Sequence, residues 1–208
     1  MISYYFPLFI LASVFLIVGI EYLKRTLSLP VLLTRKAAHM GGALIAFLSP
    51  LFLNQKEIII ISILFAVALY FTRRTSFFSS IHAVNRTTLG EVFLPLGVLL
   101  CALFFLPEET SAFQFGVLVM GISDGLAGLI GERFGTHRIQ LFNSKKTIEG
   151  TGVFFITCLI LTFFFIPGID YRLLMIPLIL TTMEFFLEYG LDNLMLPIAA
   201  SSLIRFLN

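Results

Sequence analysis

The sequence predicts an all-α, polytopic membrane protein with about eight transmembrane helices. Of its 208 residues, 58% are hydrophobic and only 12% are charged, a composition typical of integral membrane proteins. Apolar runs that approach the roughly 20 residues needed to cross a bilayer follow one another along the chain. The loops between these runs are short and leave no room for a soluble domain. We therefore expect residues 1–208 to form a single integral membrane domain.

Eight apolar segments can be marked along the chain, and each is expected to form one helix. They are residues 4–20, 37–53, 58–71, 90–105, 112–130, 150–166, 172–187 and 194–206. The first segment has no preceding basic residue and is long for the core of a signal peptide, so we interpret it as a retained helix. Cys101 and Cys158 lie inside apolar segments, where free cysteines usually serve packing.

Basic residues are distributed unevenly between alternate loops. If eight helices cross the membrane, one set of loops holds Lys24, Arg25, Arg35, Lys36, Arg73, Arg74, Arg86, Arg133, Arg138, Lys145 and Lys146, and the other holds Lys56, Arg172 and Arg205. Cytoplasmic loops are enriched in Lys and Arg. The bias of eleven to three therefore places both termini on the outer side, and an odd number of helices would scramble it.

The stretch from Gly121 to Gly152 concentrates the polar chemistry. It places Asp124 inside an apolar helix and then passes through glycines and a basic loop to the motif KKTIEG, residues 145–150. A charged residue at the centre of a membrane helix costs about 2.5–3.5 kcal/mol on insertion scales and marks a functional site by default. The glycines at 121, 125 and 128 suit close helix packing, and they also leave room for a phosphate beside Asp124.

Other polar residues are expected at the same, cytoplasmic end. Helices two, four, six and eight should begin there, with Arg35, Lys36 and His39, then Glu91, then Lys145 to Thr151, and then Asp192 near their starts. Helix N-termini attract phosphate, so four of them would form an anion-binding bowl. Asp124 and Glu184 arrive from the opposite side, and carboxylates suit Mg²⁺, which prefers oxygen ligands.

Each of these residues also has a simpler interpretation. Positive residues flank most membrane helices for topology alone, and a lone histidine in a membrane often only hydrogen-bonds a neighbouring helix. Lys145 and Lys146 are different because Thr147, Glu149, Gly150 and Thr151 follow them directly, a cluster that topology does not require. Histidine ligation of a metal is not expected, because no second histidine lies at a suitable spacing.

Together these residues resemble the CTP-dependent lipid kinases, a family that comprises dolichol kinase, phytol kinase and the CTP-using diacylglycerol kinase. The family is distantly similar to phosphatidate cytidylyltransferase. The resemblance rests on Arg35-Lys36 with His39, the loop of Arg86 followed by Gly90-Glu91, the run from Asp124 to Gly131 with Phe134-Gly135, the KKTIEG motif, and Glu184 with Asp192-Asn193 and Pro197. Thr151 stands where the family usually has serine, which keeps the hydroxyl.

The resemblance implies transfer of the γ-phosphoryl group of CTP to the hydroxyl of a membrane lipid alcohol, at the cytoplasmic face of the cytoplasmic membrane. Asp124, Lys146 and Asp192 would be catalytic. Mg²⁺ would bind Asp124, with Glu184 or Asp192 as a second ligand or as the base. The nucleotide would contact Arg35, Lys36, His39, Lys145, Thr147, Glu149, Gly150 and Thr151. The short chain favours an isoprenoid alcohol such as phytol or polyprenol over diacylglycerol.

Two other functions stay open from the sequence. Cytidylyl transfer to phosphatidic acid would use the same metal and cations, but the chain lacks the acidic, glycine-rich C-terminal signature of those enzymes, which favours a kinase. A cation-coupled transporter would use Asp124 and Glu184, but its pathway would have to cross both halves of the membrane, and polar residues are expected in only one. The net charge of +2 gives nucleic-acid binding no support.

Overall fold

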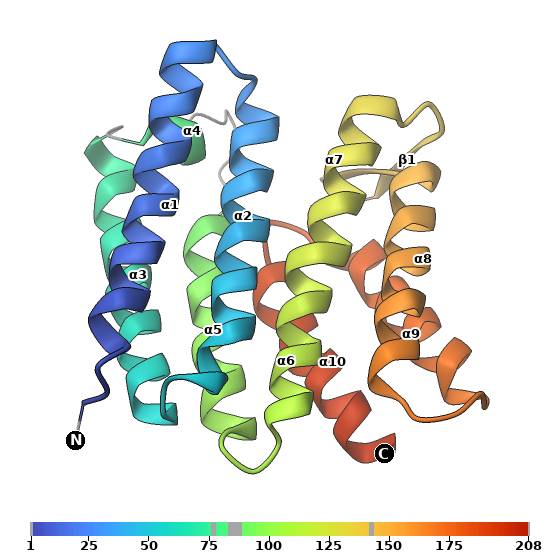
Figure 1. Cartoon of the computed structure of the whole chain (residues 1–208). Helices are drawn as coiled ribbons and strands as arrows, with labels where there is room; N and C mark the ends of the chain where they lie inside the picture. Colours follow the sequence, from blue (N-terminus) through green and yellow to red (C-terminus); the bar gives the residue numbers. More distant parts are fainter. Residues whose placement is uncertain (1, 76–77, 83–88, 142–143, 208) are drawn as a thin grey trace.

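The computed structural model describes residues 2–75, 78–82, 89–141 and 144–207, and helices make up most of it. The helices are α1 (Phe6–Leu27), α2 (Val31–Leu48), η1 (Ser49–Leu51), α3 (Gln55–Thr75), α4 (Ser79–His82), α5 (Gly90–Phe105), α6 (Thr110–Leu118), η2 (Val119–Ser123), α7 (Asp124–Phe134), α8 (Ile148–Phe165), α9 (Arg172–Phe186) and α10 (Asp192–Leu207). One hairpin, β1 (Arg138–Leu141) and β2 (Ser144–Thr147), joins α7 to α8. Both termini lie at the same end of the molecule (Figure 1).

Each predicted apolar segment overlaps a helix, so the all-α prediction is confirmed apart from the hairpin. Within the described residues, five helical segments are long and apolar enough to cross a membrane: Phe6–Leu27, Val31–Leu51, Gln55–Arg73, Thr110–Phe134 and Ile148–Phe165. The chain is therefore an integral membrane protein. Because α5, α9 and α10 are shorter, the total of eight crossings stays a prediction, as does the side on which the termini lie.

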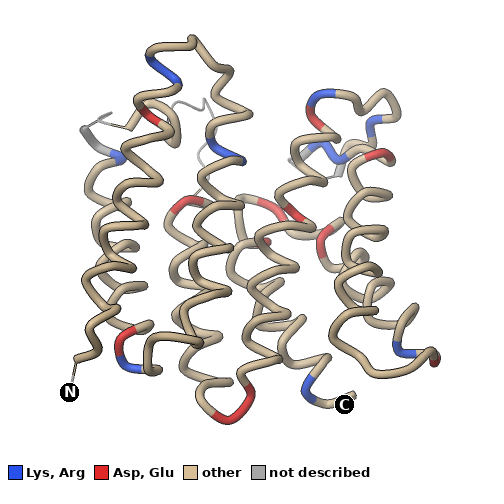
Figure 2. The backbone as a smooth tube through the Cα atoms, viewed as in Figure 1, with Lys and Arg blue, Asp and Glu red and all other residues tan. Residues whose placement is uncertain are grey.

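The charged residues are distributed as the sequence suggested. Lys and Arg gather mainly at the end of the molecule away from the termini, and several Asp and Glu residues lie at intermediate height (Figure 2). Most of the polar chemistry is thus held in one half of the molecule.

The first two helices are longer than their apolar runs. α1 continues to Leu27 and carries Lys24 and Arg25 in its last turn, where cations suit the negative end of the helix dipole. α2 begins at Val31, directly after Pro30, which lacks an N–H and therefore suits a helix start. Arg35 therefore lies within α2. It still lies near the start of that helix, as predicted, although the helix begins six residues before the predicted apolar segment 37–53.

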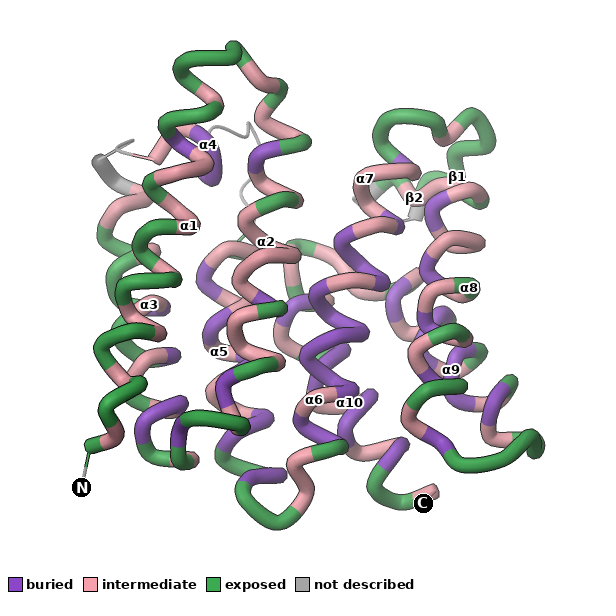
Figure 3. The backbone as a smooth tube through the Cα atoms, viewed as in Figure 1, coloured by how far each residue is buried: buried purple, intermediate pink, exposed green. Residues whose placement is uncertain are grey.

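The centre of the molecule is the continuous helical segment formed by α6, η2 and α7. Phe113, Phe115 and Met120 are fully buried there, and α2, α5, α8 and α10 pack around the segment. Buried residues accordingly concentrate in the middle of Figure 3, whereas much of α1 and α3 is exposed. Exposed apolar faces such as that of Phe15 on α1 suit contact with lipid.

Candidate active site

Asp124 lies where the central segment changes from π-helical to α-helical geometry. Its N–H bonds to the carbonyl oxygen of Val119, five positions earlier, instead of the carbonyl of Met120. The Met120 carbonyl oxygen lies 2.9 Å from His39 Nε2 on α2. Because a carbonyl oxygen only accepts, His39 donates from Nε2. Such π-bulges occur frequently at functional sites, and this one orients Asp124 towards α2.

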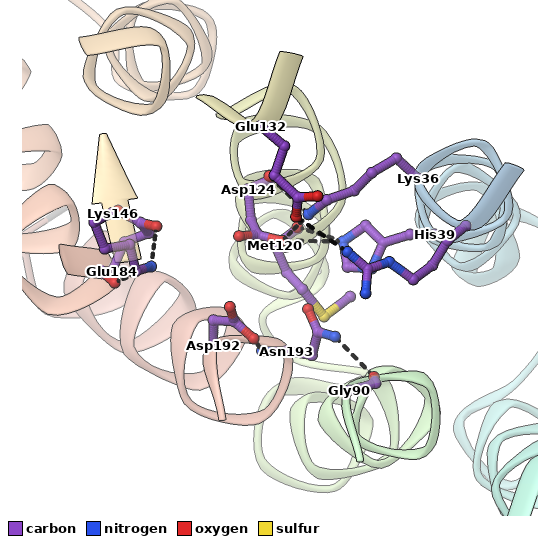
Figure 4. Close-up of polar contacts among 11 residues, drawn as sticks. Lys36, His39, Gly90, Met120, Asp124, Glu132, Lys146, Glu184, Asp192 and Asn193 are labelled. Carbon is purple, nitrogen blue, oxygen red and sulfur yellow. Dashed lines mark hydrogen bonds and ion pairs between the residues drawn. The ribbon is translucent and has the colours of Figure 1, made fainter. Parts of the chain in front are cut away.

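Lys36, also on α2, supplies the opposite charge. Its Nζ atom donates to Asp124 Oδ2 at 3.1 Å and to the Asp124 carbonyl oxygen at 3.2 Å, and the two side chains are only 12% and 7% exposed. His39 Nε2 lies 3.6 Å from the same carboxylate oxygen. Figure 4 shows Lys36 and His39 on one side of Asp124, with Asp192, Glu184 and Lys146 on the other. The ion pair with Lys36 offsets part of the free-energy cost of burying the Asp124 carboxylate.

The glycine stripe of the central segment lets α2 approach this closely. A Cβ atom on Gly125 would lie 2.6 Å from Met40 Cγ, and one on Gly128 would lie 2.5 Å from Lys36 Nζ. At Gly121 it would collide with Ala43. The packing interpretation of the stripe is therefore supported, and the space that the sequence suggested for phosphate is filled by α2.

Substituting these glycines should separate effects on the site from effects on packing. In Gly128→Ala the methyl group meets only the flexible end of Lys36, so we expect a folded protein whose activity falls up to about 100-fold, as small displacements at an active site can cause. In Gly121→Ala it meets Ala43 close to the α2 backbone, and overpacking of this kind typically costs about 1–3 kcal/mol. Gly128→Ala should therefore unfold at the higher temperature in detergent but show the lower turnover of the two variants.

The KKT part of the basic motif forms strand β2, where the sequence suggested a loop. β2 pairs antiparallel with β1, with Lys146 opposite Ile139 and Lys145 opposite Gln140. Successive residues of a strand point to opposite faces. Lys146 accordingly turns inward and is largely buried, whereas Lys145 is exposed at the mouth of the site.

Lys146 forms a buried ion pair with Glu184 on α9. Its Nζ atom donates to the Glu184 carboxylate and, at 2.7 Å, to the Glu184 carbonyl oxygen. Burial alone lowers the pKa of Lys146, but the adjacent Glu184 carboxylate outweighs burial, so that the lysine pKa lies above its ordinary value. The charge of Lys146 is therefore fixed at the wall of the site, where Asp124 and Asp192 also act on it electrostatically.

The N-terminus of α8 is capped from within the protein. The Gly150 N–H donates to Thr147 Oγ1 at 3.1 Å, and the Ile148 N–H donates to the His137 carbonyl oxygen at 3.0 Å. Side-chain capping of this kind satisfies backbone groups that would otherwise be free. The expectation that the Gly150 N–H is free to hold phosphate is therefore not met in this arrangement.

Glu149 and Thr151 lie on different sides of this capped helix end. The Glu149 carboxylate accepts from the Thr136 N–H at 3.0 Å, from the Thr136 hydroxyl at 2.6 Å and from the His137 N–H at 3.1 Å, and so fixes the turn after α7. The hydroxyl of Thr151 is buried and has no hydrogen-bond partner among the described residues. Thr151 thus offers a free polar group to a ligand, whereas Glu149 is occupied.

The N-termini of α5 and α10 meet at the site. Asn193 Nδ2 donates to the Gly90 carbonyl oxygen at 2.7 Å, and the Asn193 N–H donates to Asp192 Oδ1 at 2.8 Å. Asn193 Oδ1 is buried without a partner in the described part of the chain. The sequence indicated Asn193 only as a polar residue at the start of the last helix and as part of the resemblance motif, without a specific role.

The predicted bowl of four helix N-termini is only half formed. α5 and α10 contribute theirs, through Gly90 and Asp192. α8 also reaches the cavity described next, through Gly150 and Thr151, but its end is capped internally. α2 begins at Val31, which does not line the cavity. In a folded membrane protein the ends of helices need partners of their own, and the hairpin supplies them for α8.

A cavity of about 940 Å³ brings most of these residues together. Of the predicted site residues, Arg35, Lys36, His39, Asp124, Lys145, Lys146, Thr147, Gly150, Thr151, Glu184 and Asp192 line it, and Glu149 does not. Arg86 of the resemblance motif lies outside the described residues. Carboxylates and cations therefore line one cavity, as a site for a metal-bound polyphosphate requires.

Asp124 fits the expected magnesium site together with one neighbouring carboxylate. No group of three or more His, Cys, Asp or Glu residues placed to hold a metal occurs in the described part of the chain. Mg²⁺ usually binds proteins through one or two carboxylates and completes its shell with water and phosphate oxygens. Asp192 also lines the cavity, and Glu184 Oε2 is buried without a partner among the described residues. The donor set suits Mg²⁺ that arrives with a nucleotide.

Comparison with known proteins identifies the family. The chain is 30% identical to a phytol kinase from Synechocystis sp. over 193 residues, which cover 87% of this chain and 82% of that protein. The chain belongs to the CTP-dependent lipid kinase family. It is also 30% identical to an uncharacterized protein of Methanocaldococcus jannaschii over 132 residues, 59% of this chain and 66% of that protein. No family model and no solved structure matches the chain.

In this lipid kinase the structure adds site residues that the sequence reasoning missed. Glu132 pairs with Arg35 at 3.3 Å, and both line the cavity. The sequence did hold a signal for Glu132, because it lies eight residues after Asp124 and so shares its face of the helix. Arg138 on β1 also lines the cavity, and only the pairing of β1 with β2 brings it there.

Proposed function

We propose that this protein transfers the γ-phosphoryl group of CTP to the hydroxyl of an isoprenoid alcohol. Family membership supports a lipid kinase, and the observation that carries the proposal is a single cavity lined by Asp124, Lys146 and Asp192 at one end and by apolar side chains at the other. The active site would face the cytoplasm, because the excess of basic residues lies at that end of the molecule. The membrane would be the cytoplasmic membrane.

The reaction would join the alcohol oxygen to the γ-phosphorus and break the bond from that phosphorus to the oxygen it shares with the β-phosphate, so that CDP leaves. Asp124 would hold Mg²⁺, which supplies charge neutralisation on the phosphates when bound. We assign the hydroxyl proton to Asp192, because Lys146 already engages the Glu184 carboxylate. Phosphoryl transfer otherwise needs mainly positioning and electrostatic stabilisation.

The cations around the cavity would orient the nucleotide. Lys146 is fixed at the wall, Lys145 is exposed at the mouth, and Arg35 stands with Glu132 on the opposite rim. Thr151 offers a hydroxyl without a partner among the described residues. Together they would place positive charge on both sides of a triphosphate. Nothing in this arrangement selects cytosine, so the preference for CTP rests on family membership alone.

Isotope transfer tests this proposal. Purified protein in detergent with Mg²⁺ would receive CTP labelled at the α or the γ phosphate, together with phytol, other lipid alcohols, diacylglycerol or phosphatidic acid. We expect label to move to an alcohol from the γ position only. Transfer from the α position to phosphatidic acid would instead indicate a cytidylyltransferase. Competition by unlabelled ATP and CTP would identify the donor, and folded protein that labels no lipid would argue against both activities.

A further inference from the structure

The cavity continues from the polar site into an apolar arm between two helix pairs. α1 packs on α2, and α3 packs on α5. The arm is lined by Leu16 of α1, Gly42 and Ala46 of α2, Ile61 and Phe65 of α3, and Leu94 of α5. Residues spaced three or four apart share one face of a helix. Gly42 and Ala46 continue the face of α2 that carries His39, so the arm is continuous with the active site.

The arm ends at a floor where the chain passes from α2 to α3. Leu53 and Ile58 line it there and are only 6% and 3% exposed. The ring of Phe52 packs on Tyr5 and Phe9, with ring centroids 5.2 and 5.9 Å apart, which ties the floor to the start of α1. From His39 to its last residue, Leu48, α2 rises roughly 14 Å at about 1.5 Å per residue. The arm is thus a compartment of finite length.

We propose that this arm holds the tail of the acceptor alcohol and that its floor at Leu53 and Ile58 limits the length of that tail. The inference rests on the proposed function. The whole cavity, at about 940 Å³, lies near the upper end of the range of about 300–1,000 Å³ typical of small-molecule sites, which suits two ligands bound end to end. The acceptor is therefore a single-chain prenyl alcohol no longer than about the size of phytol. Long polyprenols and two-chain diacylglycerol do not fit.

The shape of the arm, and not its hydrophobicity, selects which acceptor tails are bound. A lipid tail in the bilayer is already in a medium as apolar as leucine, so it gains little by transfer into the protein. Packing and steric exclusion then set which tails are bound. A floor that stops the chain will therefore discriminate by length at the level of turnover.

Gly42 provides a way to shorten the arm. A Cβ atom there would lie 3.9 Å from its nearest neighbour, Leu94 Cδ2, an ordinary contact, so the leucine side chain of Gly42→Leu would extend into the arm. We expect the variant to lose at least about tenfold in turnover of phytol and geranylgeraniol, the scale of selectivity that small steric changes produce. Turnover of the short prenol geraniol should fall by a smaller factor, because less of its tail lies beyond Gly42. Gly19→Leu on α1, where a Cβ atom meets nothing within 4 Å and which does not line the cavity, is the matched control.

The wild-type protein and the variant would be compared on geraniol, farnesol, phytol, a long polyprenol and diacylglycerol with γ-labelled CTP. An equal loss on all prenols in Gly42→Leu, or no loss on any, would overturn the assignment of the tail to this arm. Wild-type turnover of long polyprenol or diacylglycerol as fast as that of phytol would overturn the length limit. Absence of transfer to every alcohol in the wild-type protein would refute the proposed function itself, which keeps the two failures distinct.

Discussion

Replacing Asp124 with asparagine is expected to abolish phosphoryl transfer in a protein that still folds. Asparagine matches aspartate in shape and can still accept the hydrogen bond of Lys36 through its amide oxygen. It loses the negative charge that the proposed Mg²⁺ needs, and a metal ion is worth several kcal/mol of transition-state stabilisation. At about 1.4 kcal/mol per factor of ten, turnover should fall at least about 1,000-fold.

The control for this variant is Glu132→Gln, on the same helix face. Glu132 pairs with Arg35 near the surface, where an ion pair is worth about 0–1 kcal/mol, so the substitution should leave stability nearly unchanged and reduce turnover far less. Both variants would be compared by thermal unfolding in detergent and by label transfer across a Mg²⁺ titration. If Asp124→Asn turns over at a near-normal rate with an unchanged Mg²⁺ requirement, Asp124 does not bind the metal.

Removing the amine of Lys146 is expected to harm both stability and activity, and only the stability should be recoverable. Lys146→Met leaves the buried Glu184 carboxylate without its partner, and breaking such a pair typically costs about 3–5 kcal/mol. Adding Glu184→Gln removes the stranded charge and should restore most of that loss. If Lys146 also stabilises the transferring phosphate, the double variant should stay about 100-fold or more below wild-type turnover.

The matched control is Lys145→Met on the same strand. Lys145 is exposed, so its removal should change the free energy of unfolding by no more than about 0.5 kcal/mol. Wild type, Lys146→Met, Glu184→Gln and the double variant form a double-mutant cycle, and Lys145→Met serves as the reference. Unfolding midpoints and nucleotide dependence would be measured for all five proteins. If the double variant turns over at the wild-type rate, the Lys146–Glu184 pair is only a structural contact between the hairpin and α9.

The sequence by itself determined the helices and the general location of the site. In a bilayer every backbone polar group must find its partner within the protein, so an apolar run of sufficient length becomes a helix almost regardless of its exact composition. The same medium makes Asp124 costly, which is why one buried carboxylate was enough to indicate the site. The short KKTIEG motif was recognisable because Thr147, Glu149 and Gly150, which follow its lysines, serve no topological purpose. Asp192 was selected from its place at the start of the last helix and from the family resemblance.

Only the tertiary structure decided which charges meet. Lys36 and Asp124 are 88 residues apart and pair because the glycine stripe admits α2, while Lys146 pairs with Glu184 because β2 pairs with β1 and turns one lysine inward. Glu149 was predicted beside them, yet it holds the turn at Thr136 and His137. Residue type and local spacing set what a side chain can bind, but its actual partner depends on the approach of helices distant in sequence. For the same reason, the apolar arm between α1, α2, α3 and α5 exists only in the folded chain.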